Sequence, residues 1–261
     1  MPIPLHGPAT AQACCFGPTA TGPSQILKQK IDQQSAETVT AGSDQPWMPR
    51  LSPDGKYILF VSSPGGINGA SQRIMRVGSS GEAPQLVMEV PRFGNFACPR
   101  APADTCLVAQ PSEDGKKLIF TAFDPLQGKT HDVLTLDIHG GTIYNWMPSP
   151  DGSSIAFMAY SPVEGVIRII SLKGEPESDI TVKGGAGFNS VDWAADGKSL
   201  FVSSQSPTSS TLLHVDMKGN ATPLWDQRGA WRTWAIAAPN GRELAIQGMT
   251  SSSNVWMIEN F

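Results

Sequence analysis

The stretch SPDGKYILF, residues 52–60, is repeated along the chain with small changes. It returns as PSEDGKKLIF (111–120), PSPDGSSIAF (148–157), AADGKSLFV (194–202) and APNGRELAI (238–246). The glycines of these copies stand at 55, 115, 152, 197 and 241, so successive copies lie 60, 37, 45 and 44 residues apart. Repeats of this length are typical of folds in which each copy forms one supersecondary unit.

Each copy predicts a tight turn followed by a strand. In Ser-Pro-Asp-Gly, Pro presets φ, Asp can bond the local backbone, and Gly takes the left-handed conformation of a bulged hairpin. Apolar residues such as Ile58 and Phe60 then alternate, which indicates one buried face of a strand. Leu59 between them is apolar too, which favours a strand covered on both faces. The predicted turn residues are Asp54, Gly55, Asp114, Gly115, Asp151, Gly152, Asp196, Gly197, Asn240 and Gly241.

A third strand follows each copy, and a short fourth strand follows two of them clearly. The third strands are expected at 71–77, 132–138, 166–172, 211–217 and 253–259, and the fourth at 85–90 and 179–182. Four antiparallel strands in each unit are the pattern of a β-propeller blade. We therefore expect an all-β fold, a β-propeller with blades at about 46–90, 106–140, 141–183, 186–225 and 230–261.

The two ends of the chain fit this pattern less completely. Residues 24–45 match the last two strands of one more, partial blade, whereas 1–23 are rich in Pro, Gly and Thr and predict a disordered or loosely packed lead-in. The chain thus holds about five blades plus a partial one, whereas a ring commonly has six or seven. We expect a C-terminal fragment of a longer ring. The alternative is a self-contained ring closed by pairing the N-terminal strand with the last blade.

The stretch SPDGKYILFVSS (52–63), with the strand, Gly turn and short strand after it, resembles the TolB-type, WD-like propeller repeat over about 24–261. The stretches CPRAPADTCLVAQPSEDGKKLIFTAFDPLQGK (98–129) and SNVWMIENF (253–261) look like a narrower group. That group is the C-terminal propellers of bacterial multidomain chains, which follow a Ser/Thr kinase or a winged-helix regulator. This resemblance implies a sensor or docking module within a larger bacterial signalling chain.

Composition excludes several classes of partner. Only 16% of residues are charged, the net charge is -4, and no block of like charge occurs, so we expect no nucleic acid to bind this segment. No apolar run of about 18 residues is present, so no membrane span is expected in this chain. The four histidines, His6, His131, His139 and His214, lack metal-ligand spacing, and no Gly pair is followed by Lys-Ser/Thr. No metal or cofactor is therefore predicted.

The sequence carries no recognisable catalytic motif. TolB-type repeats also form the propeller half of prolyl-oligopeptidase-type serine peptidases, but no G-x-S-x-G occurs here. The repeated carboxylates of the turns lie around one rim, and we expect them to be structural and too far apart to share a substrate. The favoured interpretation is not an enzyme but a non-catalytic module that binds a protein or small ligand. One alternative is the substrate-filtering half of such a peptidase, with its hydrolase domain absent; another is a truncated product without independent function.

The binding surface is predicted on the face that carries the loops between blades and the loops from second to third strands. Aromatic, Asn and Arg side chains on loops held by a rigid scaffold suit recognition. Packing within the loops is their alternative role. The predicted surface comprises Phe93, Phe96, Tyr144, Asn145, Phe188, Asn189, Trp231 and Arg232.

Cys98 and Cys106 are a possible disulfide. They belong to the long interval, whose excess over the usual unit fits an inter-blade insertion at 91–105. Seven intervening residues allow the Cα separation of about 5.5 Å that a disulfide needs. Two thiolates without a nearby His make only half a zinc site, and two free buried thiols are the other alternative. A disulfide would place the propeller in a periplasmic or extracytoplasmic compartment; free thiols would allow a cytoplasmic one.

Overall fold

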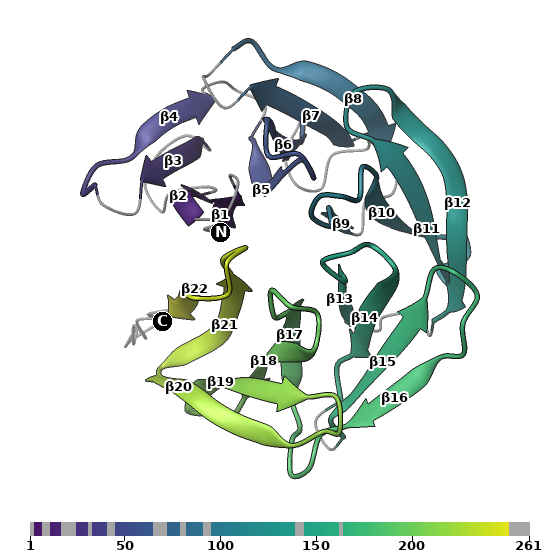
Figure 1. Ribbon diagram of the computed structural model, residues 1–261, viewed down its shortest axis with the longest axis vertical. Helices are drawn as coiled ribbons and strands as arrows, with labels where there is room; N and C mark the ends of the chain where they lie inside the picture. The colour runs from purple at the N-terminus through teal and green to yellow at the C-terminus, as the bar shows by residue number, and fades with distance from the viewer. Residues whose placement is uncertain are drawn as a thin grey trace, which may run out of the picture.

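The computed structural model describes residues 3–6, 11–16, 25–30, 33–40, 45–64, 72–78, 82–90, 95–138, 144–161 and 164–250. These residues form strands joined by turns, with no helix among them. Their six antiparallel sheets stand around a central axis like the blades of a propeller (Figure 1). The predicted all-β propeller is confirmed.

The blades are numbered along the chain. Blade 1 has the strands β1 (Ile3–His6), β2 (Ala11–Phe16), β3 (Ile26–Lys30) and β4 (Glu37–Thr40). Blade 2 has β5 (Trp47–Leu51), β6 (Tyr57–Ser62), β7 (Gln72–Gly78) and β8 (Gln85–Val90). Blade 3 has β9 (Asn95–Ala97), β10 (Cys106–Pro111), β11 (Lys117–Asp124) and β12 (Gly128–Asp137).

The remaining blades follow the same antiparallel plan. Blade 4 has β13 (Tyr144–Pro148), β14 (Ser154–Ala159), β15 (Val166–Ser171) and β16 (Ser178–Thr181). Blade 5 has β17 (Phe188–Trp193), β18 (Ser199–Gln205), β19 (Ser209–Asp216) and β20 (Ala221–Arg228). Blade 6 has, within the described residues, the pair β21 (Ala230–Ala237) and β22 (Leu244–Thr250). The third strand predicted at 253–259 lies outside the described residues.

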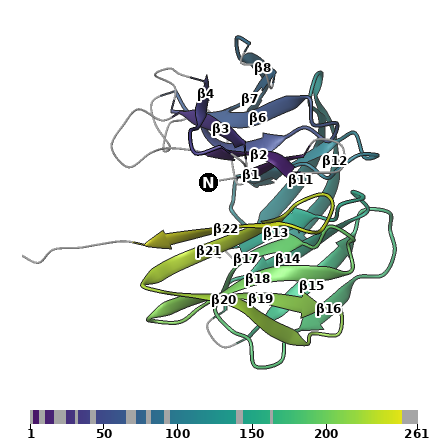
Figure 2. The same ribbon diagram turned by 60° about the vertical axis from the view of Figure 1, so that its left-hand side comes forward.

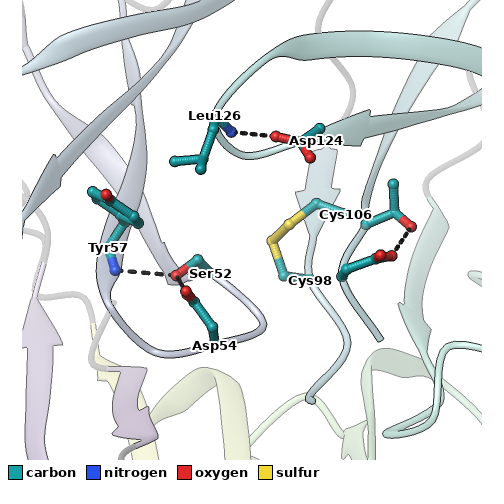
Figure 3. Close-up of a disulfide and its surroundings, with 9 residues drawn as sticks. Ser52, Asp54, Tyr57, Cys98, Cys106, Asp124 and Leu126 are labelled. Atoms are coloured by element: carbon teal, nitrogen blue, oxygen red, sulfur yellow. Dashed lines mark hydrogen bonds between the residues drawn. A yellow bond between two sulfur atoms is a disulfide. The ribbon is translucent and has the colours of Figure 1, made fainter. Parts of the chain in front are cut away.

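The repeated turns have the predicted geometry. The turn glycines have φ between 67° and 72° in all five copies, in the left-handed region that favours glycine. In the first copy the Gly55 amide donates to the Ser52 carbonyl at 2.9 Å, and Ser52 Oγ donates to Asp54 Oδ1 at 2.6 Å. The same serine hydroxyl accepts from the Tyr57 amide at 3.0 Å (Figure 3). Each turn is therefore a rigid connection between two strands.

Packing between blades explains why the repeat strands are apolar on both faces. Leu59 and Val61 of β6 pack toward blade 3, whereas Ile58 and Phe60 of the same strand pack toward blade 1. The interface of blades 3 and 4 contains Phe120 and Trp146 among its buried residues. Alternate residues of one strand thus belong to two different cores, as expected for sheets stacked face to face.

The N-terminal segment departs from the prediction. Residues 1–23 were expected to be a loose lead-in, but β1 and β2 lie there and complete blade 1. β2 pairs antiparallel with β3, with Cys15 opposite Lys28. The backbone hydrogen bonds of a neighbouring strand hold this segment in a sheet, and such tertiary pairing overrides composition. The partial blade predicted at 24–45 is therefore the outer half of a four-stranded one.

Blade 3 also departs from the prediction. β9 lies inside the segment 91–105 that was expected to be an insertion between blades, and it pairs with the inner side of β10. Buried Phe96 and Ala97 give this short strand its packing. The blade predicted at 106–140 therefore begins earlier, and the segment 98–105 is a connection within it. Within the described residues blade 3 has no strand outside β12. Compared with the other four-stranded blades, it has one additional strand at the centre and one fewer at the outer edge.

The first and last sheets are neighbours in the ring. Blade 1 and blade 6 lie beside each other in both views (Figures 1 and 2), and β1 contacts both β5 and β21. The described residues thus form six sheets, five of them four-stranded, where the sequence predicted about five blades and a partial one.

Candidate functional site

Three charged side chains gather in the central channel. Arg50 comes from β5, Asp192 from β17, and Arg100 from the connection between β9 and β10. All three line one cavity of about 70 Å³. Its other walls are formed by Leu51, Ser52, Pro53, Ala97, Cys98, Pro99, Met147, Pro148, Pro150, Trp193 and Ile236.

The repeat explains how Arg50 and Asp192 come to face each other. Each stands two residues before the first residue of a repeated turn, on the innermost strand of its blade. Met147 and Ile236 hold the same position in blades 4 and 6. Side chains at equivalent positions of inner strands point to the same side, so this position of the repeat lines the channel. In blade 3 the additional strand β9 is the innermost strand, and its residue Ala97 lines the cavity.

Arg100 reaches the channel on a short segment closed by a disulfide. The Cys98–Cys106 bond, with Cα atoms 4.2 Å apart, joins the two ends of segment 98–106 (Figure 3). The Ala101 amide donates to the Pro53 carbonyl at 3.1 Å, and the Arg100 amide donates to the Pro150 carbonyl at 3.0 Å. Arg100 Nη2 donates to the Ala237 carbonyl at 2.8 Å. The segment therefore spans blades 2, 4 and 6 across the turn side of the channel.

We expect loss of the disulfide to destabilise the protein. Replacing Cys98 and Cys106 together by Ala should lower the free energy of unfolding by about 2–3 kcal/mol, because a closed loop of this length restricts the unfolded chain. Urea unfolding of the variant and the parent measures this difference. Wild-type protein unfolded in the presence of a reductant should match the variant. Equal unfolding midpoints for the variant and the oxidised parent would contradict the expectation.

Burial and mutual charge shift the pKa values of the cluster. Burial raises the pKa of Asp192 to about 6. The Trp193 amide, which donates to Asp192 Oδ1 at 2.7 Å, and the two arginines lower this pKa but do not outweigh burial. Burial lowers the pKa of Arg50 to about 10 and lowers that of Arg100, while Asp192 opposes both shifts. The guanidiniums stay charged at neutral pH. With Asp192 ionised, the cluster carries one net positive charge.

Arg100 Nη1 and Asn95 Oδ1 of β9 are buried and have no hydrogen-bond partner among the described residues. Asn95 lines a second cavity of about 20 Å³, together with Asn145, Asp192 and Trp234. Buried polar atoms are rarely left unpaired, so both are available to a ligand or to water.

A larger cavity lies on the turn side and shares part of its wall with the channel cavity. This turn-side cup has a volume of about 830 Å³ and shares Pro53, Arg100, Pro150 and Trp193 with the channel cavity. Its apolar wall includes Ile169 and Met217. Its full lining is Pro53, Asp54, Arg100, Ala101, Pro102, Ser149, Pro150, Asp151, Ser153, Ser154, Ile169, Trp193, Ala195, Asp196, Gly197, Met217 and Pro239.

The cup corrects one inference from the sequence. The repeated carboxylates were expected to lie too far apart to share a ligand, but Asp54, Asp151 and Asp196 all border this cavity. They are nonetheless held by their own turns. Asp151 Oδ1 accepts from Ser149 Oγ at 2.6 Å and from the Ser153 amide at 3.0 Å. These hydrogen bonds, that of Ser149 first, lower the pKa of Asp151, so its carboxylate stays ionised at neutral pH.

Three residues of the predicted loop-face surface lie in the interior. Phe96 is fully buried and packs edge-on against Phe123, with 6.2 Å between ring centroids. Phe188 belongs to the core between blades 4 and 5. Asn189 is buried, accepts a hydrogen bond from Ser203 Oγ and donates to Gln205. Alternation along β9 and β17 turns these side chains toward neighbouring sheets, so they offer no surface to a partner.

The other predicted residues are partly exposed or lie outside the description. Tyr144 stacks on Phe157 at 6.1 Å, and burial raises the pKa of its hydroxyl. Asn145 Oδ1 accepts from the Val191 amide at 3.2 Å. The Arg232 guanidinium lies 5.2 Å from the Trp234 ring centroid. Phe93 and the side chain of Trp231 lie outside the described residues. A partner surface at Tyr144, Asn145 and Arg232 stays a prediction.

Two further features of the described residues bear on function. No three His, Cys, Asp or Glu side chains among them are grouped so that they could hold a metal ion. In the same part of the chain no helix is long and apolar enough to cross a membrane.

Comparison with known proteins defines the fold. No family model matches this sequence, and no curated protein matches it. Among solved structures, TolB from Acinetobacter baumannii matches with a TM-score of 0.59 at 15% identity, over 80% of this chain and 50% of that one. The fold is a TolB-like β-propeller. This chain spans half the length of that TolB structure.

The TolB-like fold is shared with enzymes. An oligogalacturonate lyase in complex with manganese matches with a TM-score of 0.61 at 16% identity, over 92% of this chain and 68% of that one. A prolyl endopeptidase matches with a TM-score of 0.55 at 14% identity, over 90% of this chain and 37% of that one. At these identities the likeness shows the fold alone, and function has to be argued from the site.

Proposed function

We propose that this propeller is a non-catalytic binding module that holds a ligand in the turn-side cup. The observation that carries the proposal is the cup itself, which measures about 830 Å³ and shares Arg100 and Trp193 with the charged channel cavity. Ligand sites are typically cavities of about 300–1,000 Å³ with apolar walls and a few convergent polar groups. Here Ile169, Met217 and Trp193 supply apolar wall, and Arg100 supplies the polar group at the base.

The rigidity of the cup supports binding rather than chemistry. Its rim carboxylates accept hydrogen bonds within their own turns, as Asp54 does from Ser52 Oγ at 2.6 Å and from the Lys56 amide at 3.1 Å. A general acid needs a carboxyl that holds its proton near neutral pH. The pKa of Asp151 is shifted the other way. We therefore assign these carboxylates a structural role, which is to stabilise the turns that form the rim of the cup.

The rival assignment is the substrate-filtering propeller of a serine peptidase. Solved prolyl endopeptidases share the fold, but a filter requires that a peptide can pass along the channel. Here segment 98–105 is hydrogen-bonded to Pro53, Pro150 and Ala237 across the turn side of that channel. This arrangement favours a closed-ended binding site over a passage.

The proposal extends to the setting of the module. A disulfide at Cys98–Cys106 supports an oxidising, periplasmic or extracytoplasmic compartment. With the resemblance of segment 98–129 to propellers of signalling chains, it supports a sensor that reports an extracytoplasmic ligand to a kinase or winged-helix partner.

The proposed function is tested by filling the cup. Protein-observed NMR with a library of small acids, amines, sugars and short peptides should yield ligands that shift the Trp193 indole signal. Replacing Met217, which is 40% exposed, by Trp should weaken those ligands about tenfold or more, whereas Leu224→Trp, at an exposed site on β20 outside the cup, should not. Recovered ligands should be chemically unchanged. Equal binding to both variants, or conversion of a ligand to product, would refute the proposal.

A further inference from the structure

We propose that the ligand of the turn-side cup carries a single carboxylate group, which is bound at the base of the cup by the guanidinium of Arg100. This inference rests on the proposed function and names the chemical class of its ligand.

The charge of the channel cavity calls for an anion. Arg50, Arg100 and Asp192 are the charged residues that border it within the described chain. Two guanidiniums and one carboxylate leave one positive charge in a site where burial itself shifts the pKa of each group. This net positive charge of the described groups attracts an anion, and one carboxylate from a ligand neutralises it.

The hydrogen bonds of Arg100 orient its free donor. Its amide is held by the Pro150 carbonyl at 3.0 Å, and its Nη2 by the Ala237 carbonyl at 2.8 Å. Nη1 is buried and has no hydrogen-bond partner among the described residues, and Arg100 borders both the channel cavity and the cup. A guanidinium fixed in this way presents N–H donors in a rigid fork that matches a carboxylate.

The volumes of the two cavities define the shape of the ligand. The channel cavity, which Arg100 also borders, measures only about 70 Å³ against about 830 Å³ for the cup, so the cup holds most of the ligand. The body of the ligand lies against Ile169, Met217 and Trp193. The inferred ligand is therefore an acid with an apolar body.

The rim of the cup limits the number of anionic groups. Asp54, Asp151 and Asp196 border the cup outside the channel, and a second carboxylate there would meet like charge. The site therefore selects acids with one terminal carboxylate over diacids. Two sources supply such a group: a small organic acid, and the C-terminus of a peptide with apolar side chains.

The experiment compares matched acids and amides on the full chain. The probes are hexanoate with hexanamide, and N-acetyl-Leu-Leu with its C-terminal amide, titrated by calorimetry or NMR. At least one acid should bind about tenfold or more tightly than its amide, as expected for a hydrogen bond to a charged group. Hexanoate as the binder identifies a small acid, and the dipeptide identifies a peptide C-terminus; either supports the proposal. Equal binding of acid and amide overturns it.

Variants of Arg100 test the assigned residue. Arg100→Gln should reduce the affinity of the acid to that of the amide, and Arg100→Lys, which keeps the charge but not the fork, should give an intermediate value. The control is Arg168→Gln, which removes an exposed arginine on β15 paired with Glu177 at 2.6 Å and should leave binding unchanged. Circular dichroism checks that each variant is folded. Unchanged acid affinity in folded Arg100→Gln and Arg100→Lys overturns the proposal.

Failure of this inference differs from failure of the proposed function. If only neutral or cationic compounds bind, and Met217→Trp abolishes their binding, the cup is the binding site but its ligand is not an acid. If no compound in the library binds at the cup, both proposals fall.

Discussion

Replacing Phe120 by Ala is expected to lower the free energy of unfolding by about 3–5 kcal/mol. Phe120 lies on β11, is fully buried and meets the ring of Trp146 edge-on at 4.9 Å between centroids. The substitution removes a whole ring from the interface of blades 3 and 4 and leaves a cavity that the surrounding strands cannot fill. Denaturant unfolding monitored by circular dichroism measures the loss.

Phe201→Ala is the matched control. Phe201 is only partly buried, on β18, where its ring centroid lies 5.6 Å from that of His214. Its replacement removes the same atoms from a site that water already reaches, so a smaller loss is expected. A loss in Phe120→Ala no larger than that in Phe201→Ala would show that the interface of blades 3 and 4 is not a close-packed core.

The second large effect is a gain of stability on mild acidification. The pKa of Asp192 is about 6 in the folded protein, above its ordinary value of 3.8. Between these two pKa values the folded protein binds more protons than the unfolded chain. The free energy of unfolding therefore rises as the pH falls through 6, and it levels off near pH 3.8, the pKa of Asp192 in the unfolded chain. A shift of about two units corresponds to at most about 3 kcal/mol. We expect about half of this gain between pH 7 and pH 5.

The pH profile of Asp192→Asn checks the assignment. Arg50 and Arg100, the charged groups that face Asp192, do not titrate in this range. The lowered pKa of Asp151 acts in the opposite direction, but only near pH 4 and below. The urea midpoint should therefore rise from pH 7 to pH 5 in the parent and stay level in Asp192→Asn. Asp196→Asn, on the rim turn of the same blade, should keep the rise. A parent that loses stability over this range would contradict the assignment.

Much of the fold could be predicted from one local pattern. A Ser-Pro-Asp-Gly turn followed by Ile58 and Phe60 specifies a hairpin and a strand buried on both faces, and both are properties of a few adjacent residues. The strands β1, β2 and β9 were missed because they follow no such turn. β9 is three residues long and depends on β10 for its hydrogen bonds, so nothing in its own sequence identifies it as a strand.

The candidate site could not be predicted from spacing alone. Arg50, Arg100 and Asp192 are far apart in sequence, and the ring brings them together across the channel. A signal for two of them was nevertheless present. When the repeats are aligned, Arg50 and Asp192 occupy one position, two residues before the turn, where opposite charges on inner strands indicate a shared channel. Arg100 has no equivalent in other repeats, because its segment occurs once.

The segment that carries Arg100 also has a consequence for how the ring comes apart. In a repeat protein whose units touch only their neighbours, unfolding can start at one interface and spread from blade to blade. Here the hydrogen bonds of segment 98–105 to Pro53, Pro150 and Ala237 join blades that are not adjacent. Opening blade 2, 4 or 6 therefore breaks the hydrogen bond between that blade and a segment to which the other two blades are also bonded. We therefore expect the segment to couple the unfolding of these three alternate blades.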